Sequence, residues 1–172
     1  DETSMTDGGC WVSIDAGVTN LTLLNTTATD DYNATNTTVP DGGYHAQFWC
    51  NDSANNVNNT ETKDFSVDAT YPEINITNQI NNSNLSSATF DLNYTYVETN
   101  PDSCWYSNNS GITNSSIVPM GTNWTDLIGM EGVNNLTIYC NDTVNNINLS
   151  LVTFHIETGN TVTFCRDLDV AN

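Results

Sequence analysis

The chain has 172 residues, and 21 Asp plus Glu against 2 Lys plus Arg give it a formal net charge of −19. Nucleic acids and anionic membrane surfaces both require cations on the protein, so neither is an expected partner. No run approaches the roughly 20 apolar residues of a membrane-spanning helix, so we expect no membrane insertion. The chain starts with Asp1-Glu2 rather than a basic and then apolar stretch, which we interpret as a secretion signal already removed.

Amides and hydroxyls dominate the polar residues, with 28 Asn and 26 Thr against only 13% charged residues. Hydrophobic residues still make up 37% of the chain and fall in alternating runs. That pattern favours a folded, β-rich chain over a disordered one.

Two strands are predicted around cysteines in the first half of the chain. Cys10, Val12 and Ile14 share one face of the first strand. One face of the second carries Ala46, Phe48 and Cys50. We expect these faces to form core, so the aromatic residues next to the cysteines must point to the opposite face.

Seven strands are predicted in the second half, and no segment there shows a 3.6-residue period. Phe90, Leu92, Tyr94 and Tyr96 alternate cleanly along one of them. In chain order the seven cover 73–77, 88–97, 103–107, 112–118, 123–128, 135–140 and 149–157. The segments 112–118 and 123–128 carry the weaker pattern.

The two halves are an internal repeat. Residues 10–13 (CWVS) match 104–107 (CWYS), and 48–58 match 138–148, with offsets of 94 and 90 residues. Such offsets are the size of one small β-sandwich. Pro72 lies where the first repeat ends and the second begins, as is typical of a proline between two units. We therefore predict an all-β chain of two tandem immunoglobulin-like β-sandwich units, 1–68 and 69–158, followed by a C-terminal tail, 159–172.

Four of the five cysteines occupy repeat positions. The repeat implies the disulfides Cys10–Cys50 and Cys104–Cys140, and it leaves Cys165 as a spare thiol or an inter-subunit cross-link. Disulfides are typical of an oxidising exterior. Zinc is disfavoured and we expect no metal site of this kind, because the chain has no Cys-x-x-Cys and only two histidines.

An aromatic pair is expected on the outer side of each disulfide. The pairs are Trp11 with Trp49 and Trp105 with Tyr139. Such a pair either stiffens the sheet as a cross-strand contact or offers a platform to a glycan or a neighbouring subunit.

Acceptor triplets for N-glycosylation, Asn-x-Ser/Thr, are more frequent than composition explains. Chance placement of the 28 Asn among 39 Ser plus Thr would give about 6, whereas the chain has 16. Unused triplets in an Asn- and Thr-rich protein are the alternative, but we predict a secreted, densely glycosylated protein. The predicted sites are Asn20, Asn25, Asn33, Asn36, Asn51, Asn58, Asn75, Asn81, Asn84, Asn93, Asn108, Asn114, Asn123, Asn135, Asn141 and Asn148.

The first unit is predicted to lack its N-terminal strands. In the second repeat 33 residues run from Tyr71 to Cys104, whereas only nine precede Cys10. The tail Asn160–Asn172 alternates like a strand, so we predict that it completes the first unit of another copy. The alternatives are a fragment of a longer array and completion within one chain. The predicted donor-strand residues are Val162, Phe164, Leu168 and Val170.

The segment 135–148 (NLTIYCNDTVNNIN), with Cys104-Trp105-Tyr106-Ser107 before it, resembles the immunoglobulin-like repeats of archaeal cell-surface glycoproteins. The resemblance extends over both units. It implies an extracellular or cell-surface coat, adhesion or filament protein, and it carries no catalytic residues over to this chain.

We therefore expect a structural subunit that is not an enzyme and assembles with itself head-to-tail. The alternatives are a piece of an S-layer-like adhesive array and a carbohydrate-binding surface module. We expect no cofactor apart from covalent N-glycans. Calcium at Asp52 and Asp142, beside Asn51 and Asn141, is an alternative, but the chain has no EF-hand spacing and we favour turn-forming side chains at these positions.

Overall fold

The computed structural model describes residues 8–25, 32–78 and 81–159, and every regular element in these ranges is a β-strand. No helix in the described ranges is long and apolar enough to cross a membrane. The chain divides into two compact units, Asp1–Thr70 and Tyr71–Asn172. Each unit is considered by itself below.

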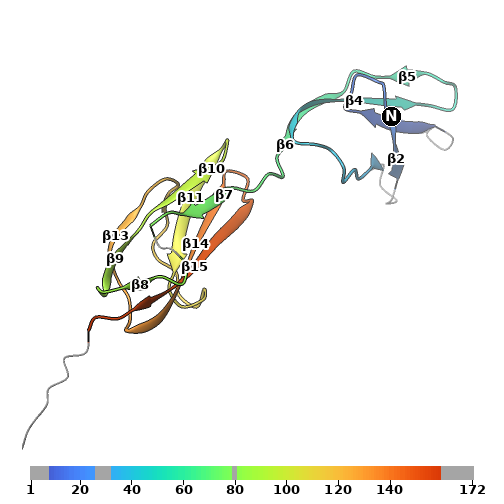
Figure 1. Ribbon diagram of the computed structural model, residues 1–172. Coiled ribbons are helices and arrows are strands. Elements are labelled where there is room, and N and C mark those ends of the chain that lie inside the picture. The colour runs from blue at the N-terminus through green and yellow to red at the C-terminus, as the bar shows by residue number, and fades with distance from the viewer. Residues whose placement is uncertain (1–7, 26–31, 79–80, 160–172) are drawn as a thin grey trace, which may run out of the picture. The chain divides into compact units, whose positions relative to one another are not determined.

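Unit 1 consists of one sheet in the residues described (Figure 1). The strand order is β3-β2-β1-β4-β5, and β6 pairs with β4 as well. Cys50 of β4 pairs with Cys10 of β1 on one edge and with Asn58 of β5 on the other. The strands are β1 Gly9–Ser13, β2 Leu21–Asn25, β3 Tyr32–Asn33, β4 Gly42–Asn51, β5 Val57–Asn58 and β6 Thr62–Val67.

Unit 2 is a two-layered sandwich (Figure 1). One layer is a five-stranded sheet of order β12-β11-β14-β15-β8, and the other holds the pairs β10–β7 and β13–β9. The strands are β7 Glu73–Ile76, β8 Asn84–Leu85, β9 Thr89–Leu92, β10 Tyr94–Val97, β11 Pro101–Ser107, β12 Val118–Pro119, β13 Trp124–Ile128, β14 Gly132–Asp142 and β15 Ile147–Ile156.

The core of unit 2 lies between its layers. Leu136 and Ile138 of β14 and Phe154 of β15 point into it from the five-stranded sheet, and Leu92 of β9 meets them from the other layer. All four are at most 1% exposed. The alternation of apolar and polar residues along β14 and β15 places one face of each strand in this core.

One predicted strand of unit 2 is wrong in its extent. Residues 88–97 form two strands, β9 and β10, which pair with β13 and β7 respectively. Between them the backbone N–H of Asn93 donates to Asn78 Oδ1 at 2.8 Å, and its carbonyl accepts from Thr77 N at 2.9 Å. The alternation continues through Asn93, but the partner strand changes there.

The weaker prediction over 112–118 is also wrong in its extent, because only Val118–Pro119 is a strand there. The backbone N–H of Thr113 donates to Asn109 Oδ1 at 2.9 Å, and that of Ser115 donates to the Tyr106 carbonyl at 2.9 Å. This segment is therefore held by local loop hydrogen bonds rather than by a ladder. The prediction over 123–128 corresponds to β13, from Trp124 to Ile128.

Candidate assembly surface

One face of the unit 1 sheet is apolar across four strands. Strand register places the side chains of β1, β2, β4 and β6 that share the face of Cys10 in adjacent rows. We call this set the unit 1 apolar face. It consists of Cys10, Val12, Leu21, Leu23, Tyr44, Ala46, Phe48, Cys50, Lys63, Phe65 and Val67.

No second layer of described residues covers the unit 1 apolar face. Only Cys10, Leu23 and Ala46 on it are buried, and Phe65, which stacks on Tyr44 with ring centroids 5.4 Å apart, is 38% exposed. Both clusters of buried apolar residues found in the described ranges lie in unit 2.

Equivalent positions in unit 2 show what such a face looks like when it is covered. Phe65 lies opposite Tyr44 in the ladder, as Phe154 lies opposite Asn134. Phe154 is 0% exposed and packs edge-on against Phe90 of β9, with ring centroids 5.0 Å apart. The layer that covers Phe154 has no counterpart among the described residues of unit 1.

Lys63 is the one cation of the unit 1 apolar face. It pairs opposite Ala46, where unit 2 has Val152 opposite Leu136, and Val152 is only 3% exposed. The Lys63 side chain is exposed. A strand that covered this face would meet an ammonium group where unit 2 has a buried valine.

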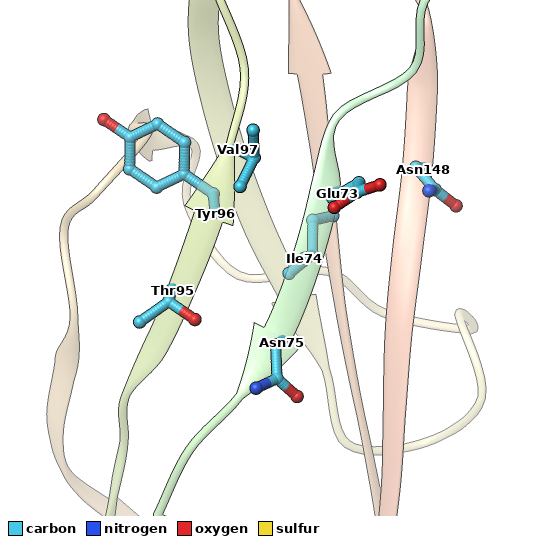
Figure 2. A pocket seen from close by; sticks show the side chains of 7 residues that line it. All are labelled: Glu73, Ile74, Asn75, Thr95, Tyr96, Val97 and Asn148. Carbon is cyan, nitrogen blue, oxygen red and sulfur yellow. The ribbon is translucent and has the colours of Figure 1, made fainter.

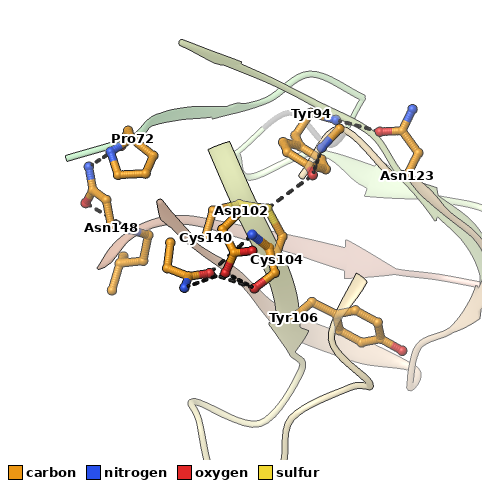
Figure 3. Close-up of a disulfide and its surroundings, with 12 residues drawn as sticks. Pro72, Tyr94, Asp102, Cys104, Tyr106, Asn123, Cys140 and Asn148 are labelled. Atoms are coloured by element: carbon orange, nitrogen blue, oxygen red, sulfur yellow. Dashed lines mark hydrogen bonds between the residues drawn. A yellow bond between two sulfur atoms is a disulfide. The ribbon is translucent and has the colours of Figure 1, made fainter. Parts of the chain in front are cut away.

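Both predicted disulfides are present and join directly paired residues of neighbouring strands. They close sequence separations of 40 and 36 residues. In unit 2 the Tyr94 hydroxyl lies 3.2 Å from Cys104 Sγ and accepts a hydrogen bond from Gly121 N at 2.7 Å (Figure 3). Cys104 and Cys140 are fully buried.

The aromatic residues beside the disulfides stack on the outer face of each sheet. Trp11 and Trp49 lie opposite each other with ring centroids 6.5 Å apart and an interplanar angle of 8°. Trp105 and Tyr139 repeat this with 5.8 Å and 9°. All four side chains are half-buried, so each stack presents an accessible aromatic surface.

A hairpin loop after the first cysteine strand is repeated in both units, and sequence reasoning missed it. Buried Ser13 donates through Oγ to Asp15 Oδ1 at 2.7 Å and accepts from Gly17 N at 2.8 Å. Ser107, Asn109 and Gly111 repeat these bonds at 2.9 and 2.8 Å. The available signal was Ser-x-Asx-x-Gly-x-Thr, at 13–19 and 107–113.

The backbone conformation of these two hairpin loops explains why each contains a glycine. Ala16 and Gly17 have φ of 57° and 87°, and Ser110 and Gly111 have 60° and 84°. Two successive left-handed residues form a hairpin turn of the primed type, in which glycine costs no steric strain.

The repeated Asn-Asp pairs are turn-forming residues. The carboxylate of fully buried Asp142 accepts from the backbone N–H groups of Val144 and Asn146, at 2.9 and 2.8 Å, and from Asn146 Nδ2 at 2.7 Å. Asp52 makes the same bonds to Ala54 and Asn56. No group of three or more His, Cys, Asp or Glu suited to a metal ion occurs in the described ranges. These contacts favour the turn over the calcium alternative.

The predicted glycosylation sites differ in exposure. Asn141 is 8% exposed, because its Oδ1 accepts from Ser103 Oγ at 2.7 Å and its Nδ2 donates to Asp102 and Asn145, each at 3.1 Å. Asn51 and Asn93 are half-buried. The side chain of Asn25 lies outside the described residues. The exposed sites are Asn20, Asn33, Asn36, Asn58, Asn75, Asn81, Asn84, Asn108, Asn114, Asn123, Asn135 and Asn148.

A pocket of about 360 Å³ lies beside β7 and β10 (Figure 2). Asn75 and Asn148, two of the exposed triplet asparagines, line it together with Glu73 and Tyr96. The Asn148 amide also donates to the Pro72 carbonyl at 2.9 Å (Figure 3). Two predicted glycan attachment points therefore line the pocket.

The predicted donor-strand residues Val162, Phe164, Leu168 and Val170 lie outside the described residues, as does Cys165.

Comparisons with known proteins identify the fold. No protein-family model matches the chain, nor does any curated protein. The fibronectin(III)-like modules of Clostridium thermocellum CbhA match with a TM-score of 0.51 and 13% identity, over 91% of this chain and 81% of theirs. A tetra-tandem repeat in the extending region of a large adhesion protein matches with a TM-score of 0.43 and 17% identity, over 88% of this chain and 42% of the repeat's.

A third match is the Bacteroides ovatus protein SGBP-B of a mixed-linkage glucan utilization locus, solved in complex with a heptasaccharide. Its TM-score is 0.28 and its identity 13%, over 86% of this chain and 37% of that one. Of the three matches, only that to CbhA exceeds a TM-score of 0.5, and it is to tandem modules. The chain therefore has an all-β fold of tandem immunoglobulin- or fibronectin(III)-like modules.

Proposed function

We propose that this protein is an extracellular structural glycoprotein whose copies assemble head-to-tail, with residues 160–172 of one copy covering the unit 1 apolar face of the next. The observation that carries the proposal is that face itself. On this face Val12 and Phe48 are half-buried and Phe65 is exposed, beside a disulfide of which only Cys10 is buried. Such a face is half of a sandwich core, and accessible apolar patches of this kind mark interaction sites.

The proposed occupant has the composition of a strand. Its 13 residues alternate apolar side chains at Val162, Phe164, Leu168 and Val170. Arg166 interrupts this alternation on the apolar side, and Asp167 and Asp169 fall on the opposite side of the strand. A strand donated by one copy to the next makes a heterologous contact, and such contacts propagate into an open filament.

The two disulfides and the exposed triplets support an extracellular location. At Asn36 and Asn58 the Oδ1 atom accepts both the N–H and the hydroxyl of the threonine two residues later, with distances of 2.9 to 3.1 Å. The Nδ2 atom, which would carry the glycan, takes no part in these turns. We propose glycans on the exposed asparagines and none on Asn141.

A mixing experiment on the full-length chain tests the assembly. One variant carries Phe164→Asp in the proposed donor strand, and the other carries Phe65→Asp on the acceptor face. Each variant alone should stay monomeric, and an equimolar mixture should form dimers that do not grow, because only one donor and one acceptor remain intact.

Three results would contradict the proposal. The mixture stays monomeric if each chain covers its own face. A wild-type chain that stays monomeric would mean that residues 160–172 do not cover the face of another copy. That result is expected if the chain belongs to a longer protein in which residues upstream of Asp1 cover the face. Filaments formed by both variants would mean that assembly uses another surface.

Carbohydrate binding is the second candidate function, and the accessible stacks Trp11–Trp49 and Trp105–Tyr139 favour it. Aromatic faces can pack against the apolar faces of sugar rings. Titration of the deglycosylated chain with soluble glucans, followed by tryptophan fluorescence, tests this function. A saturable change that Trp105→Ala and Trp11→Ala abolish would support it, and an unchanged spectrum would reject it.

A further inference from the structure

Each unit ends in a carboxylate contact at equivalent positions. Asp41 directly precedes Gly42, the first residue of β4, and Glu131 directly precedes Gly132, the first residue of β14. Gly42 pairs with Val67, and Gly132 pairs with Ile156. The two acidic residues therefore flank the point where the last strand of each unit ends.

Both carboxylates hold the backbone just beyond that strand. Asp41 Oδ1 accepts from the N–H of Ala69, two residues after Val67, at 2.8 Å, and Oδ2 accepts from the Thr70 hydroxyl. Glu131 accepts from the N–H of Thr158, two residues after Ile156, at 3.2 Å to Oε2. The Thr158 hydroxyl donates to Oε2 at 2.8 Å. We call these contacts the unit 1 clamp and the unit 2 clamp.

The unit 1 clamp is followed within three residues by the first strand of a module. After Thr70 come Tyr71 and Pro72, and β7 starts at Glu73. Pro72 is fully buried in unit 2, and its carbonyl accepts from Asn148 Nδ2. In this chain the clamp thus marks the point where one module ends and the opening strand of the next begins.

The same spacing after the unit 2 clamp reaches the proposed donor strand. The threonines whose hydroxyls donate to the two clamp carboxylates, Thr70 and Thr158, are 88 residues apart, and this offset maps β7 onto residues 161–164. The apolar pair Val162 and Phe164 corresponds to the half-buried pair Ile74 and Ile76 at an offset of 88. The segment therefore has the position and pattern of an opening strand of the β7 type.

We propose that Glu131 is a positioning residue for assembly, which directs residues 160–172 out of unit 2 as a β7-type strand for unit 1 of the next copy. The inference rests on the proposed function for the identity of the acceptor. In unit 2, Ile76 of β7 packs against the core cluster that contains Phe154. Phe164 should accordingly lie against Phe65, the counterpart of Phe154, in the next copy.

The positioning role is tested with Glu131→Ala in the full-length glycosylated chain. Amide hydrogen exchange of Thr158 in the monomer should become at least tenfold faster, and the assembly rate constant should fall at least fivefold. Glu157→Gln is the matched control, because it neutralises an exposed carboxylate next to Thr158 that makes no described clamp contact. It should change neither quantity.

The strand assignment is tested by cross-linking copies that carry Phe65→Cys with copies that carry Phe164→Cys, both in a Cys165→Ser background. Disulfide-linked dimers should form from this pair. Thr62→Cys, on the opposite face of β6, is the control and should give none with Phe164→Cys.

The outcomes separate the inference from the proposed function. Faster exchange at Thr158 with an unchanged assembly rate would overturn the positioning role and leave head-to-tail assembly intact. Equal cross-linking at residues 62 and 65 would overturn the β7-type assignment. A wild-type chain that never assembles would overturn both proposals together.

Discussion

Units 1 and 2 share one framework but differ in what covers it. Both have a disulfide between paired strands, an aromatic stack outside it, a Ser-x-Asx hairpin, an Asp-capped turn and a terminal clamp. Only unit 2 has a second layer and a continuous buried core among the described residues. Both units therefore share polar turns and a cystine between paired strands, whereas in the described residues only unit 2 adds a continuous apolar core between two layers.

Removal of the disulfides should give the largest difference between the units. By chain entropy each contributes about 4 kcal/mol, which is a large fraction of a small domain's stability. Replacement of Cys10 and Cys50 by Ala should unfold unit 1 in the unassembled chain, whereas the same change at Cys104 and Cys140 should lower the unfolding midpoint of a unit 2 that still folds. Hydrogen exchange resolved by segment measures both effects. If the amides of β1 and β4 stayed protected without their disulfide, unit 1 would not depend on its disulfide more than unit 2 does.

Truncation of the equivalent phenylalanines, Phe154 and Phe65, tests directly whether a second layer covers each of them. Phe154→Ala should destabilise unit 2 by about 3–5 kcal/mol, the usual cost for a fully buried phenylalanine. Phe65→Ala should cost unit 1 about 1 kcal/mol or less in the monomer, because its ring is 38% exposed. Denaturant unfolding of the monomer measures both, and equal costs would mean that the unit 1 apolar face is already covered within one chain.

The capped turns should show a smaller difference. Asp142→Ala leaves three donors without their acceptor in a fully buried site, at a cost of about 1–3 kcal/mol. Asp52→Ala should destabilise less, because water can reach the half-buried turn of unit 1. Asp142→Asn, which keeps one acceptor oxygen, is the control and should recover part of the loss. A larger effect at Asp52 than at Asp142 would contradict this account.

The smallest difference is a pH dependence of the hairpin in unit 1, which has Asp15 where the hairpin of unit 2 has Asn109. Hydrogen bonds from the Ser13 hydroxyl and the Thr19 backbone N–H lower the pKa of Asp15 from 3.8 to about 2. The folded state favours the ionised form, so this stabilisation is complete above pH 3.8 and disappears as the pH falls through about 2. The amide resonance of Thr19 should titrate in that range, and that of Thr113, beside the neutral Asn109, should not. A titration midpoint near pH 3.8 for the Thr19 amide would mean that Asp15 has its ordinary pKa, and it would contradict this prediction.

The cysteine strands and their faces were predictable because the repeat and the two-residue period are local signals. The alternation of Cys10 and Val12, and of Phe48 and Cys50, specifies which residues pair and which face is apolar. The break at Asn93 was not predictable, because it arises where the chain changes its partner strand and not from any change in local pattern.

The exposure of the asparagine in each glycosylation triplet likewise could not be predicted from the sequence. The triplet at Asn141 looks like the others, but its side chain is bonded to Asp102 and Ser103, about 40 residues away in the chain. By contrast, the clamps at Asp41 and Glu131 could have been found, since Asp-Gly and Glu-Gly stand 90 residues apart at the start of the repeated strands.

Electron cryo-microscopy of native, undigested material tests the central claim most directly. We predict filaments in which density over Val12, Phe48 and Phe65 traces without a break to residue 159 of a neighbouring copy. Discrete particles, or density over this face that traces to residues upstream of Asp1 in the same chain, would contradict the account.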